Sequence, residues 1–571
     1  MIEVVQLHSI NDIPRDEWNG LVKQSEFDNI FLTHEWMTSW WDIFGADYEL
    51  LLYAAKENDI LLGLAPMMIH SRIMEFVSTG EADYSDFIAT SERKSEVLKA
   101  FFDQFHKVRK RFDLMILENI PDRSITPQFL RDYGRNLFPM MRDWISNQCP
   151  ALIIRGNEEF VLSCLRKNDV KTRFNYLNKN GKLEYKIAET PDEILRELDT
   201  LFKLHEERRF IAGGQSKFDN PKPREFYKKL IDVMLPLGWL RFDSLKFNDE
   251  PLAYHFGFYY GDTLYHYTPT FNLDYYKRSP GTVIIKFMIE DCLKRNAKEF
   301  DFTRGAEQYK KRFANLSRDN FRFEIYTNPI AWNIANWTSS IKEWLKNRHP
   351  RILSKLKSGL NSARISDIKN EIKYSIQKNG ILRTVFKIAQ ASIGDFIYHS
   401  STAIIFRKTL GDETTAQNSS FTIREGRLSD LYGIVEGRTQ LRRRQFLPLA
   451  FQRLNDGERL FVVEKNNRIV HYSWAITTNK FDLIEIRSHY NLENKVGYIY
   501  HCFTIDDARG YGIYPAVLRH ICEVFKSDGL QEVYIYCMDK NIASMKGIEK
   551  AGFKRLTTRG LTRILGIPFK R

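Results

Sequence analysis

Two short stretches of this sequence place a basic residue and a glycine directly between an apolar strand and a helix. They are Arg509-Gly510-Tyr511-Gly512-Ile513-Tyr514 and Arg278-Ser279-Pro280-Gly281-Thr282. The N-terminus of a helix presents unpaired backbone N–H groups and a partial positive charge, and glycine lets a ligand approach them closely. Arginine adds charge-assisted hydrogen bonds. Both stretches therefore predict a site for a pyrophosphate or a similar anion.

Hydrophobic spacing predicts the elements that would hold the first stretch. An apolar strand is expected over 498–505, and a helix over 515–525 follows the loop. A strand over 533–537 and a helix over 541–551 come next. The loop therefore lies at a junction between a strand and a helix, where a ligand can reach the helix N-terminus.

The second stretch has a similar setting. Three consecutive antiparallel strands are expected over 239–247, 252–260 and 263–268, and a helix over 283–295 begins after the loop. A short strand over 300–302 then leads into a dense polar cluster. Its members are Asp301, Arg304, Glu307 and Lys310. Clustered charge at a strand end fits a substrate-binding cleft, and it also fits an exposed turn.

The C-terminal sequence also matches a known pattern. RGYGIYPAVLRHI, followed by NIASMKGIEKAGF, resembles the signature of the GNAT superfamily of acyltransferases over about residues 421–554. The matching residues are Arg509, Gly512, Asn541, Ser544, Gly552 and Phe553. The resemblance implies that the backbone of 509–514 binds the pyrophosphate of acetyl-CoA or another acyl-CoA. It also implies that Asn541, with Ser544, helps to hold the pantetheine arm or the loop.

Two positions depart from the family pattern. Tyr514 replaces the last small residue of the loop, and Ile548 stands where the family often has a general-acid tyrosine. A free thiol has a pKa of about 8.5, so the acid is helpful rather than essential, and Tyr500 or Tyr498 is a candidate substitute. His501 and Glu485 are the candidate bases for an attacking amine. His501 also fits a packed strand residue, and Glu485 also fits a solvent-facing one.

A second resemblance covers about residues 30–315. The matching pieces are FLTHEWMTSWWDIF, GEADYSDFI, YKRSPGTVIIKFMIEDCLKRN and FDFTRGAEQYKKRF. They resemble GNAT-like proteins associated with cellulose and exopolysaccharide synthesis, which share a fold with Fem-type aminoacyl transferases. The resemblance implies two fused acyltransferase-fold halves. Within them, Arg278, Gly281 and Thr282 mark a second candidate acyl-CoA loop.

Charge is concentrated in one segment of the chain. The formal net charge is +13, and residues 331–410 hold 14 Lys and Arg against 4 Asp and Glu, a net charge of +10. The apolar residues of this segment recur at helical spacing. A basic amphipathic segment either lies on an anionic membrane surface or packs on a neighbouring domain as a solvated linker. Its charge also suits a nucleic acid such as tRNA.

The cysteines and the N-terminus indicate the compartment. None of the six cysteines forms a Cys-x-x-Cys pair or lies near a histidine at metal-ligand spacing, so we expect buried thiols, a reducing compartment and no metal site. No signal peptide and no apolar run of about 18 residues is visible. We therefore expect a cytoplasmic protein, which the basic segment could hold at the inner membrane.

Together these patterns predict an α/β (α+β) protein of tandem GNAT-like domains, with mixed, mostly antiparallel sheets flanked by helices. The expected domains are 1–155, 156–330, a basic helical linker over 331–415, and 416–571. The expected activity is N-acyl transfer, most simply of acetyl, to a nucleotide-linked amino sugar or another cell-envelope or exopolysaccharide precursor. Two alternatives stay open: a Fem-type transferase that uses charged tRNA, and an inactive protein that docks a polysaccharide synthase.

Overall fold

The computed structural model describes residues 2–348, 398–411, 421–435, 440–483, 486, 488–564 and 567–570. The chain divides near residue 353 into two compact units, called unit 1 and unit 2 below. Unit 1 contains both predicted N-terminal halves, and unit 2 contains the C-terminal domain. In the part of the chain that the structure describes, no helix is long and apolar enough to cross a membrane.

Within the described residues, unit 1 is built on one 13-stranded sheet, in the order β1-β2-β3-β4-β6-β13-β7-β12-β11-β10-β9-β8, with β5 paired to β3. The strands are β1 (Glu3–Leu7), β2 (Glu49–Glu57), β3 (Ile60–His70), β4 (Ile73–Phe76), β5 (Ile88–Ala89), β6 (Leu114–Pro121), β7 (Met141–Ile153), β8 (Leu183–Ile187), β9 (Leu240–Phe247), β10 (Glu250–Tyr260), β11 (Thr263–Phe271), β12 (Glu299–Asp301) and β13 (Leu316–Tyr326). The sheet is mostly antiparallel, and two pairs, β4 with β6 and β11 with β12, are parallel.

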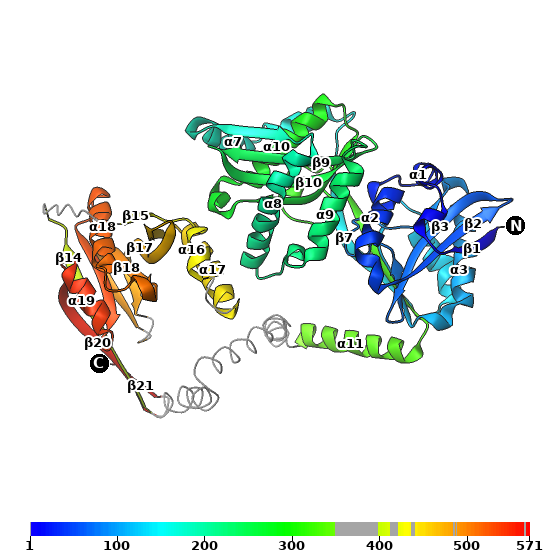
Figure 1. The fold of residues 1–571 in the computed structure, drawn as a ribbon. Coiled ribbons are helices and arrows are strands. Elements are labelled where there is room, and N and C mark those ends of the chain that lie inside the picture. The colour runs from blue at the N-terminus through cyan, green and yellow to red at the C-terminus, as the bar shows by residue number, and fades with distance from the viewer. Residues whose placement is uncertain are drawn as a thin grey trace. The chain divides into compact units, whose positions relative to one another are not determined.

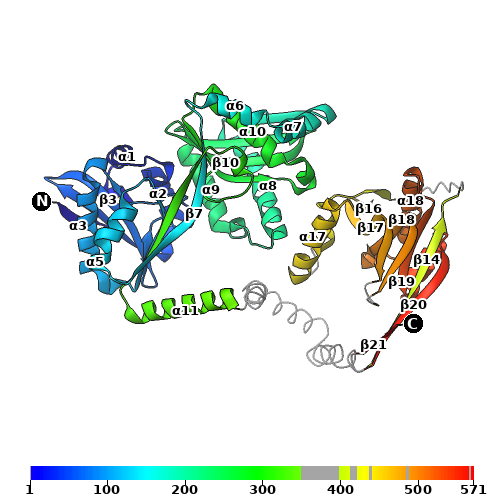
Figure 2. The same ribbon diagram turned by 180° about the vertical axis from the view of Figure 1, so that it is seen from behind.

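The two halves of unit 1 share this sheet rather than forming separate ones. β13 lies between β6 and β7, both of which precede residue 155 in the chain. Its inward residues Phe323 and Ile325 are fully buried in the core of the first half, against Met115 and Leu117. Figures 1 and 2 show β7 and the green strand β13 running side by side between the halves. The expected boundary at 155 therefore separates sequence segments, not independent sheets.

Helices cover the sheet where the apolar patterns indicate. They are α1 (Arg15–Lys23), α2 (His34–Phe44), α3 (Lys94–Lys107), α4 (Thr126–Phe129), α5 (Arg135–Leu137), α6 (Glu158–Leu165), α7 (Asn168–Asn180), α8 (Pro191–Ile211), α9 (Pro221–Met234), α10 (Pro280–Lys294) and α11 (Pro329–Arg348). Thr33 caps α2 by accepting from the N–H of Trp36, and Asn220 caps α9 in the same way. Trp36 is completely buried in a core shared by both halves, which joins them further.

Unit 2 has an eight-stranded sheet among its described residues, in the order β15-β16-β17-β18-β19-β14-β20-β21. Its strands are β14 (Tyr398–Thr409), β15 (Thr422–Glu425), β16 (Arg459–Lys465), β17 (Arg468–Leu483), β18 (Ser488–Thr504), β19 (Glu532–Met538), β20 (Lys554–Ile564) and β21 (Ile567–Lys570). Its described helices are α16 (Asp430–Val435), α17 (Gln440–Asn455), α18 (Ile513–Ser527) and α19 (Ile542–Lys550). Only β18 and β19 pair in parallel.

The sheet of unit 2 begins earlier than the boundary expected at residue 416. β14 lies between β19 and β20, and Ile405 and Phe406 are fully buried there. The basic segment 331–410 thus ends in a strand, because its last apolar run fills the core of unit 2. At its other end the expected helix is present as α11. The stretch 349–397 lies outside the described residues.

All six cysteines are free, and five of them are buried. Burial raises the pKa of the Cys292 thiol to about 12, so it stays protonated. The expectation of buried thiols is confirmed for Cys149, Cys164, Cys292, Cys522 and Cys537. Cys502 is half-buried.

Candidate functional site

In unit 1 the sheet opens beside β11. β11 pairs with β10 along its length, up to Phe271, but its parallel pairing with β12 covers only Thr263–Tyr265. Beyond Tyr265 the backbone on that side of β11 leaves the ladder with β12. Such an edge presents N–H and C=O groups that a ligand can use. The chain then runs through a short 3₁₀ helix, Leu273–Arg278, into α10.

A β-bulge fixes the start of this open edge. Between the pairs Phe256–Thr268 and Phe258–Tyr265, two residues of β11, His266 and Tyr267, oppose the single residue Gly257 of β10. A Cβ at Gly257 would collide with the carbonyl oxygen of Tyr265 and with the ring of His255. Only glycine fits opposite the bulge, so the bulge requires Gly257 at this position.

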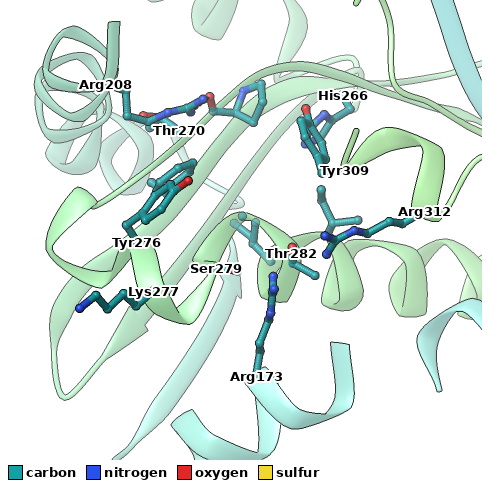
Figure 3. A pocket seen from close by; sticks show the side chains of 15 residues that line it. Arg173, Arg208, His266, Thr270, Tyr276, Lys277, Ser279, Thr282, Tyr309 and Arg312 are labelled. Atoms are coloured by element: carbon teal, nitrogen blue, oxygen red, sulfur yellow. Dashed lines mark hydrogen bonds between the residues drawn. The ribbon is translucent and has the colours of Figure 1, made fainter. Parts of the chain in front are cut away.

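A cavity of about 510 Å³ lies between the open edge and the N-terminus of α10. Its lining includes Arg173, Arg208, Lys277 and Arg312 and contains no carboxylate. In Figure 3, Arg173 from α7 and Arg312 point toward Thr282 at the start of α10, whereas Arg208 lies beside Thr270 and Lys277 points away. The volume is in the usual range for a small-molecule site. Four cations beside a helix N-terminus favour a ligand with several negative charges.

The second predicted loop forms part of this cavity. Ser279 is in the left-handed region at φ 50°, Pro280 opens the helix, and no side chain caps the first turn. Gly281 and Thr282 line the cavity, as the loop hypothesis requires. Arg278 does not line it. Its guanidinium stacks on the ring of Tyr176 and donates to the Tyr176 hydroxyl at 2.7 Å.

The four residues that were predicted to bind a substrate do not line this cavity. Asp301 is buried and accepts from Tyr84 of the first half, and Arg304 pairs with Asp83 of the first half. Lys310 is also buried, and its ammonium donates to the carbonyl of Arg304 at 2.6 Å. Glu307 is exposed and pairs with Lys310 at 3.0 Å. Asp301 and Arg304 thus join the halves of unit 1, whereas Lys310 and Glu307 pair within their own segment.

Unit 2 repeats the open edge and the bulge. β18 pairs with β17 as far as Thr504, but with the parallel strand β19 only over Gly497–Ile499. Between the pairs Tyr472–Phe503 and Trp474–Tyr500, His501 and Cys502 oppose the single residue Ser473. His501 adopts φ 47°, which is uncommon for a residue other than glycine. The two units therefore share the same bulged pairing pattern despite different sequences.

The glycine loop of unit 2 lies at the N-terminus of α18, as predicted. Gly510 and Gly512 have φ values of 87° and 74°, and a Cβ at either position would meet no atom within 4 Å. Left-handed backbone, rather than crowding, calls for glycine here. Arg509 is 60% exposed and pairs with Asp506 at 2.8 Å. Tyr511 is exposed, whereas Ile513 is buried in the core and supports the helix.

The other residues matched to the family pattern stabilise the start of α19. Asn541 caps this helix by accepting from the N–H of Ser544 at 3.1 Å. The Ser544 hydroxyl lies 3.3 Å from the Tyr514 hydroxyl. The Tyr514 ring occupies the space beside Gly547, where a Cβ would lie 2.5 Å from Cδ1 of the ring. Tyr514 therefore packs against α19, and Ile548 is fully buried in the core.

The structure brings two of the three predicted catalytic residues together. Tyr500 donates to Glu458, and Arg453 lies over the Tyr500 ring at 4.9 Å. Arg453 also donates to Nδ1 of His501 at 2.8 Å. Burial raises the pKa of Glu458. Glu485 lies outside the described residues.

Sequence reasoning missed His266, Arg208 and Arg312. His266 lines the cavity of unit 1 and is the residue that corresponds to His501 at the bulge. A weak signal was available: Tyr-His pairs occur at 254–255, 265–266, 398–399 and 500–501, and those at 265–266 and 500–501 precede the two predicted loops. The two arginines come from α8 and the segment after β12, so no local pattern links them.

Two matches to family models follow these same elements. A model described as "Acetyltransferase (GNAT) domain" matches residues 165–311, and one described as "Acetyltransferase (GNAT) family" matches residues 427–553. The chain contains two GNAT domains. The expected fold class, tandem GNAT-like domains with mixed sheets flanked by helices, is confirmed. The first GNAT domain includes β11 and α10, and the second includes β18 and α18. Neither match extends into residues 1–155.

Several solved structures are similar to part of the chain. FemX is 12% identical to this chain. The match covers 58% of this chain and 99% of FemX, with a TM-score of 0.41. A conserved protein of unknown function from Bacteroides thetaiotaomicron is 12% identical. The match covers 57% of this chain and 100% of that protein, with a TM-score of 0.37. A tandem GNAT protein from the clavulanic acid biosynthesis pathway is 10% identical. The match covers 57% of this chain and 98% of that protein, with a TM-score of 0.35. No curated protein sequence matches the chain significantly.

The two GNAT domains differ at their helix-start loops. The first has a cavity lined by four cations, and the second has an exposed glycine loop with one arginine. Both place a helix N-terminus after an open strand edge, the arrangement that can bind a pyrophosphate and polarise a carbonyl at once. Among the residues that the structure describes, no group of His, Cys, Asp and Glu could hold a metal ion.

Proposed function

We propose that this GNAT-type protein is an acyl-CoA-dependent N-acyltransferase, with its main donor site in the cavity of unit 1. The observation that carries the proposal is a cavity at the start of α10 that is lined by four cations and no carboxylate, with Arg173 and Arg312 directed toward Thr282. The phosphates of CoA carry the complementary charge. The glycine loop of unit 2 is proposed as a second donor site, since its helix N-terminus is open and uncapped by a side chain.

The residues of the cavity have separate tasks in this proposal. Arg173 and Arg312 bind the phosphates near Thr282, and Arg208 is held in place by donating to the carbonyl of Pro269 at 2.8 Å. The open edge of β11 positions the acyl arm between the strands. The bound donor supplies a thioester, whose carbonyl carbon an amine can attack.

The acceptor is proposed to be an amine on a nucleotide-linked amino sugar or another cell-envelope or exopolysaccharide precursor. This part of the proposal is supported by the sequence resemblance of residues 30–315. An amine acceptor fits the chemistry of the site, because a neutral amine attacks a thioester directly without a covalent enzyme intermediate. A cytoplasmic location is part of the same proposal.

Calorimetry on the full chain with acetyl-CoA tests the donor assignment. We expect two binding events. Arg173→Ala with Arg312→Ala removes the one in unit 1, and Gly512→Asp removes the one in unit 2. Lys311→Ala is the matched control, since Lys311 is exposed, adjacent to Arg312 and not part of the cavity lining.

Other outcomes would replace the proposal. Binding of a charged tRNA, but not of acetyl-CoA, that depends on Arg173 and Arg312 would make the protein an aminoacyl transferase. Absence of binding to either donor would favour a docking protein without activity. Unchanged affinity in the unit 1 variant would move the donor site away from the cavity.

A further inference from the structure

The bulge of β11 presents an unpaired imidazole to the cavity of unit 1. His266 is 2% exposed, and within the described structure neither of its ring nitrogens has a hydrogen-bond partner. A buried polar group without a partner costs free energy, and such groups are uncommon in folded proteins. His266 nevertheless lines the cavity, so a ligand in the cavity can provide the missing partner.

We infer that His266 donates a hydrogen bond to the thioester carbonyl of the bound donor and stabilises the negative charge that develops on its oxygen. This inference rests on the proposed function, since it needs a thioester in the cavity. It adds a catalytic residue that neither loop pattern contains.

The surroundings fix the orientation of the ring. His266 stacks on His255 with centroids 4.9 Å apart and an interplanar angle of 8°. His255 is itself held by Asp243, whose carboxylate lies 2.9 Å from Nδ1. Phe300 and Phe302 contact the His266 ring within 6 Å between centroids. A ring held on both faces can aim one N–H without reorganising during the reaction.

The charge state of His266 suits a donor rather than a base. Burial lowers its pKa well below the usual range, and nearby His255, Lys310 and Arg208 lower it further. Tyr309 also faces the ring, with centroids 6.4 Å apart. A neutral imidazole has one N–H to donate. With so low a pKa it is a poor proton acceptor, but it can polarise a carbonyl as a neutral group.

The position along β11 matches the length of an extended donor arm. Thr270 lies four residues beyond His266, about 13 Å along a strand, toward the end of β11 that leads through the 3₁₀ helix into α10. Its hydroxyl is also buried and unpartnered in the described structure, and the residue lines the same cavity. A donor whose phosphates bind at α10 would run along the open edge past Thr270 and place its thioester near His266.

The reaction balances without any proton from His266. The nitrogen of a neutral amine attacks the carbonyl carbon, a C–N bond forms and the C–S bond breaks. The sulfur leaves with the bonding electron pair and takes up the proton that the nitrogen loses. The products are an amide and the free thiol, and His266 keeps its own proton throughout.

The test uses the full chain with Gly512→Asp, so that only unit 1 is examined. The probes are acetyl-CoA labelled with ¹³C at the carbonyl, and hydroxylamine as a small amine acceptor. His266→Phe keeps a ring that packs against Phe300 and Phe302 but has no donor. We expect unchanged acetyl-CoA affinity by calorimetry, a higher carbonyl stretching frequency by infrared difference spectroscopy, and a loss in rate of about 10²-fold.

His266→Gln retains an N–H donor, so we expect it to keep a lowered carbonyl frequency and most of the rate, with the same pH dependence as the parent. Normal acetyl-CoA binding together with an unchanged frequency and rate in His266→Phe would overturn the inference alone. Failure of the parent to bind acetyl-CoA would overturn the proposed function itself. If His266→Phe does not fold, the carbonyl stretching frequency of acetyl-CoA bound to His266→Gln decides. A frequency equal to that of acetyl-CoA in water would contradict the inference.

Discussion

The hydroxyl of Tyr84 donates to both carboxylate oxygens of Asp301, at 2.9 Å each, across the join between the two halves of unit 1. Both side chains are buried. Arg123 and Arg318 approach the same carboxylate at 3.9 Å. The two residues come from the sequence pieces GEADYSDFI and FDFTRGAEQYKKRF, which the chain separates by more than 200 residues. The motifs that suggested a substrate cluster thus meet each other in the fold.

Removing this hydroxyl should destabilise unit 1. Tyr84→Phe leaves a buried carboxylate without its donor from the first half, which costs about 1–3 kcal/mol. Urea unfolding followed by far-ultraviolet circular dichroism measures the change. Tyr176→Phe is the matched control, because its hydroxyl lies at the surface and should matter by less than about 0.5 kcal/mol. Equal losses in the two variants would contradict a special role for Tyr84.

The same carboxylate should make stability depend on pH. Burial and the neighbouring Glu299 raise the pKa of Asp301 to about 6, from 3.8. The folded chain then binds more protons than the unfolded chain between these values, so this group's contribution to the free energy of unfolding falls as pH rises from about 4 to 6. Above that window the contribution is constant.

Asp301→Asn tests this pH dependence, since asparagine keeps the shape and can still accept from Tyr84. We expect a flatter curve of unfolding free energy against pH between pH 4 and 6 than the parent shows. Denaturant titrations at closely spaced pH values provide the measurement. Identical slopes for the two proteins would mean that Asp301 titrates normally.

Gly547 in α19 should be required because the Tyr514 ring packs closely against it, and not because of its backbone conformation. Gly547→Ala removes a helix-weakening residue but drives a Cβ into the Tyr514 ring, so we expect a net destabilisation of about 1–3 kcal/mol. Gly433→Ala in α16 is the control. No atom lies within 4 Å of a Cβ there, and we expect a gain of about 0.5–1 kcal/mol. Thermal melting of both variants compares them, and a stabilised Gly547→Ala would contradict the packing of Tyr514.

The exposed apolar face of α11 should contact an anionic membrane. Ile330, Ile334 and Trp337 are 71%, 57% and 67% exposed and share one side of the helix. The segment 331–410 that begins on this helix has a net charge of +10. We expect sedimentation with anionic vesicles that weakens as salt rises, because screening lengths fall to about 8 Å at physiological ionic strength.

Trp337→Ser should weaken this vesicle binding several-fold. Trp144→Ser, on β7 and 40% exposed, should leave it unchanged. Vesicles with and without anionic lipid, compared across a salt series, provide the measurement. Equal binding by the parent and Trp337→Ser would show that α11 is not the contact, and binding to tRNA alone would point to a nucleic acid instead.

Local pattern was enough to predict several strands and helices of each unit, and it placed both helix-start loops correctly. The strands expected over 239–247, 252–260 and 263–268 correspond to β9, β10 and β11. Alternation and turn residues specify such elements within a few positions. The bulge at His266 was not predictable in this way, because it depends on Gly257 opposite.

Long-range pairing explains what the sequence did not reveal. Asp301 and Arg304 were expected in a cleft, yet they pair with Tyr84 and Asp83 of the first half. The cavity combines α7, α8 and the segment after β12, whose contacts span more than 100 residues. Periodicity reports which side of an element is buried, but it does not report the partner.

The place of β13 in the sheet has a consequence for synthesis on the ribosome. β7 ends at Ile153, yet both of its neighbours, β12 and β13, are encoded after residue 298. At about 5–20 residues per second, β7 emerges many seconds before either partner exists. During that interval two strand edges are open to wrong pairing, so a nascent chain that stalls before residue 316 should be a preferred substrate for chaperones.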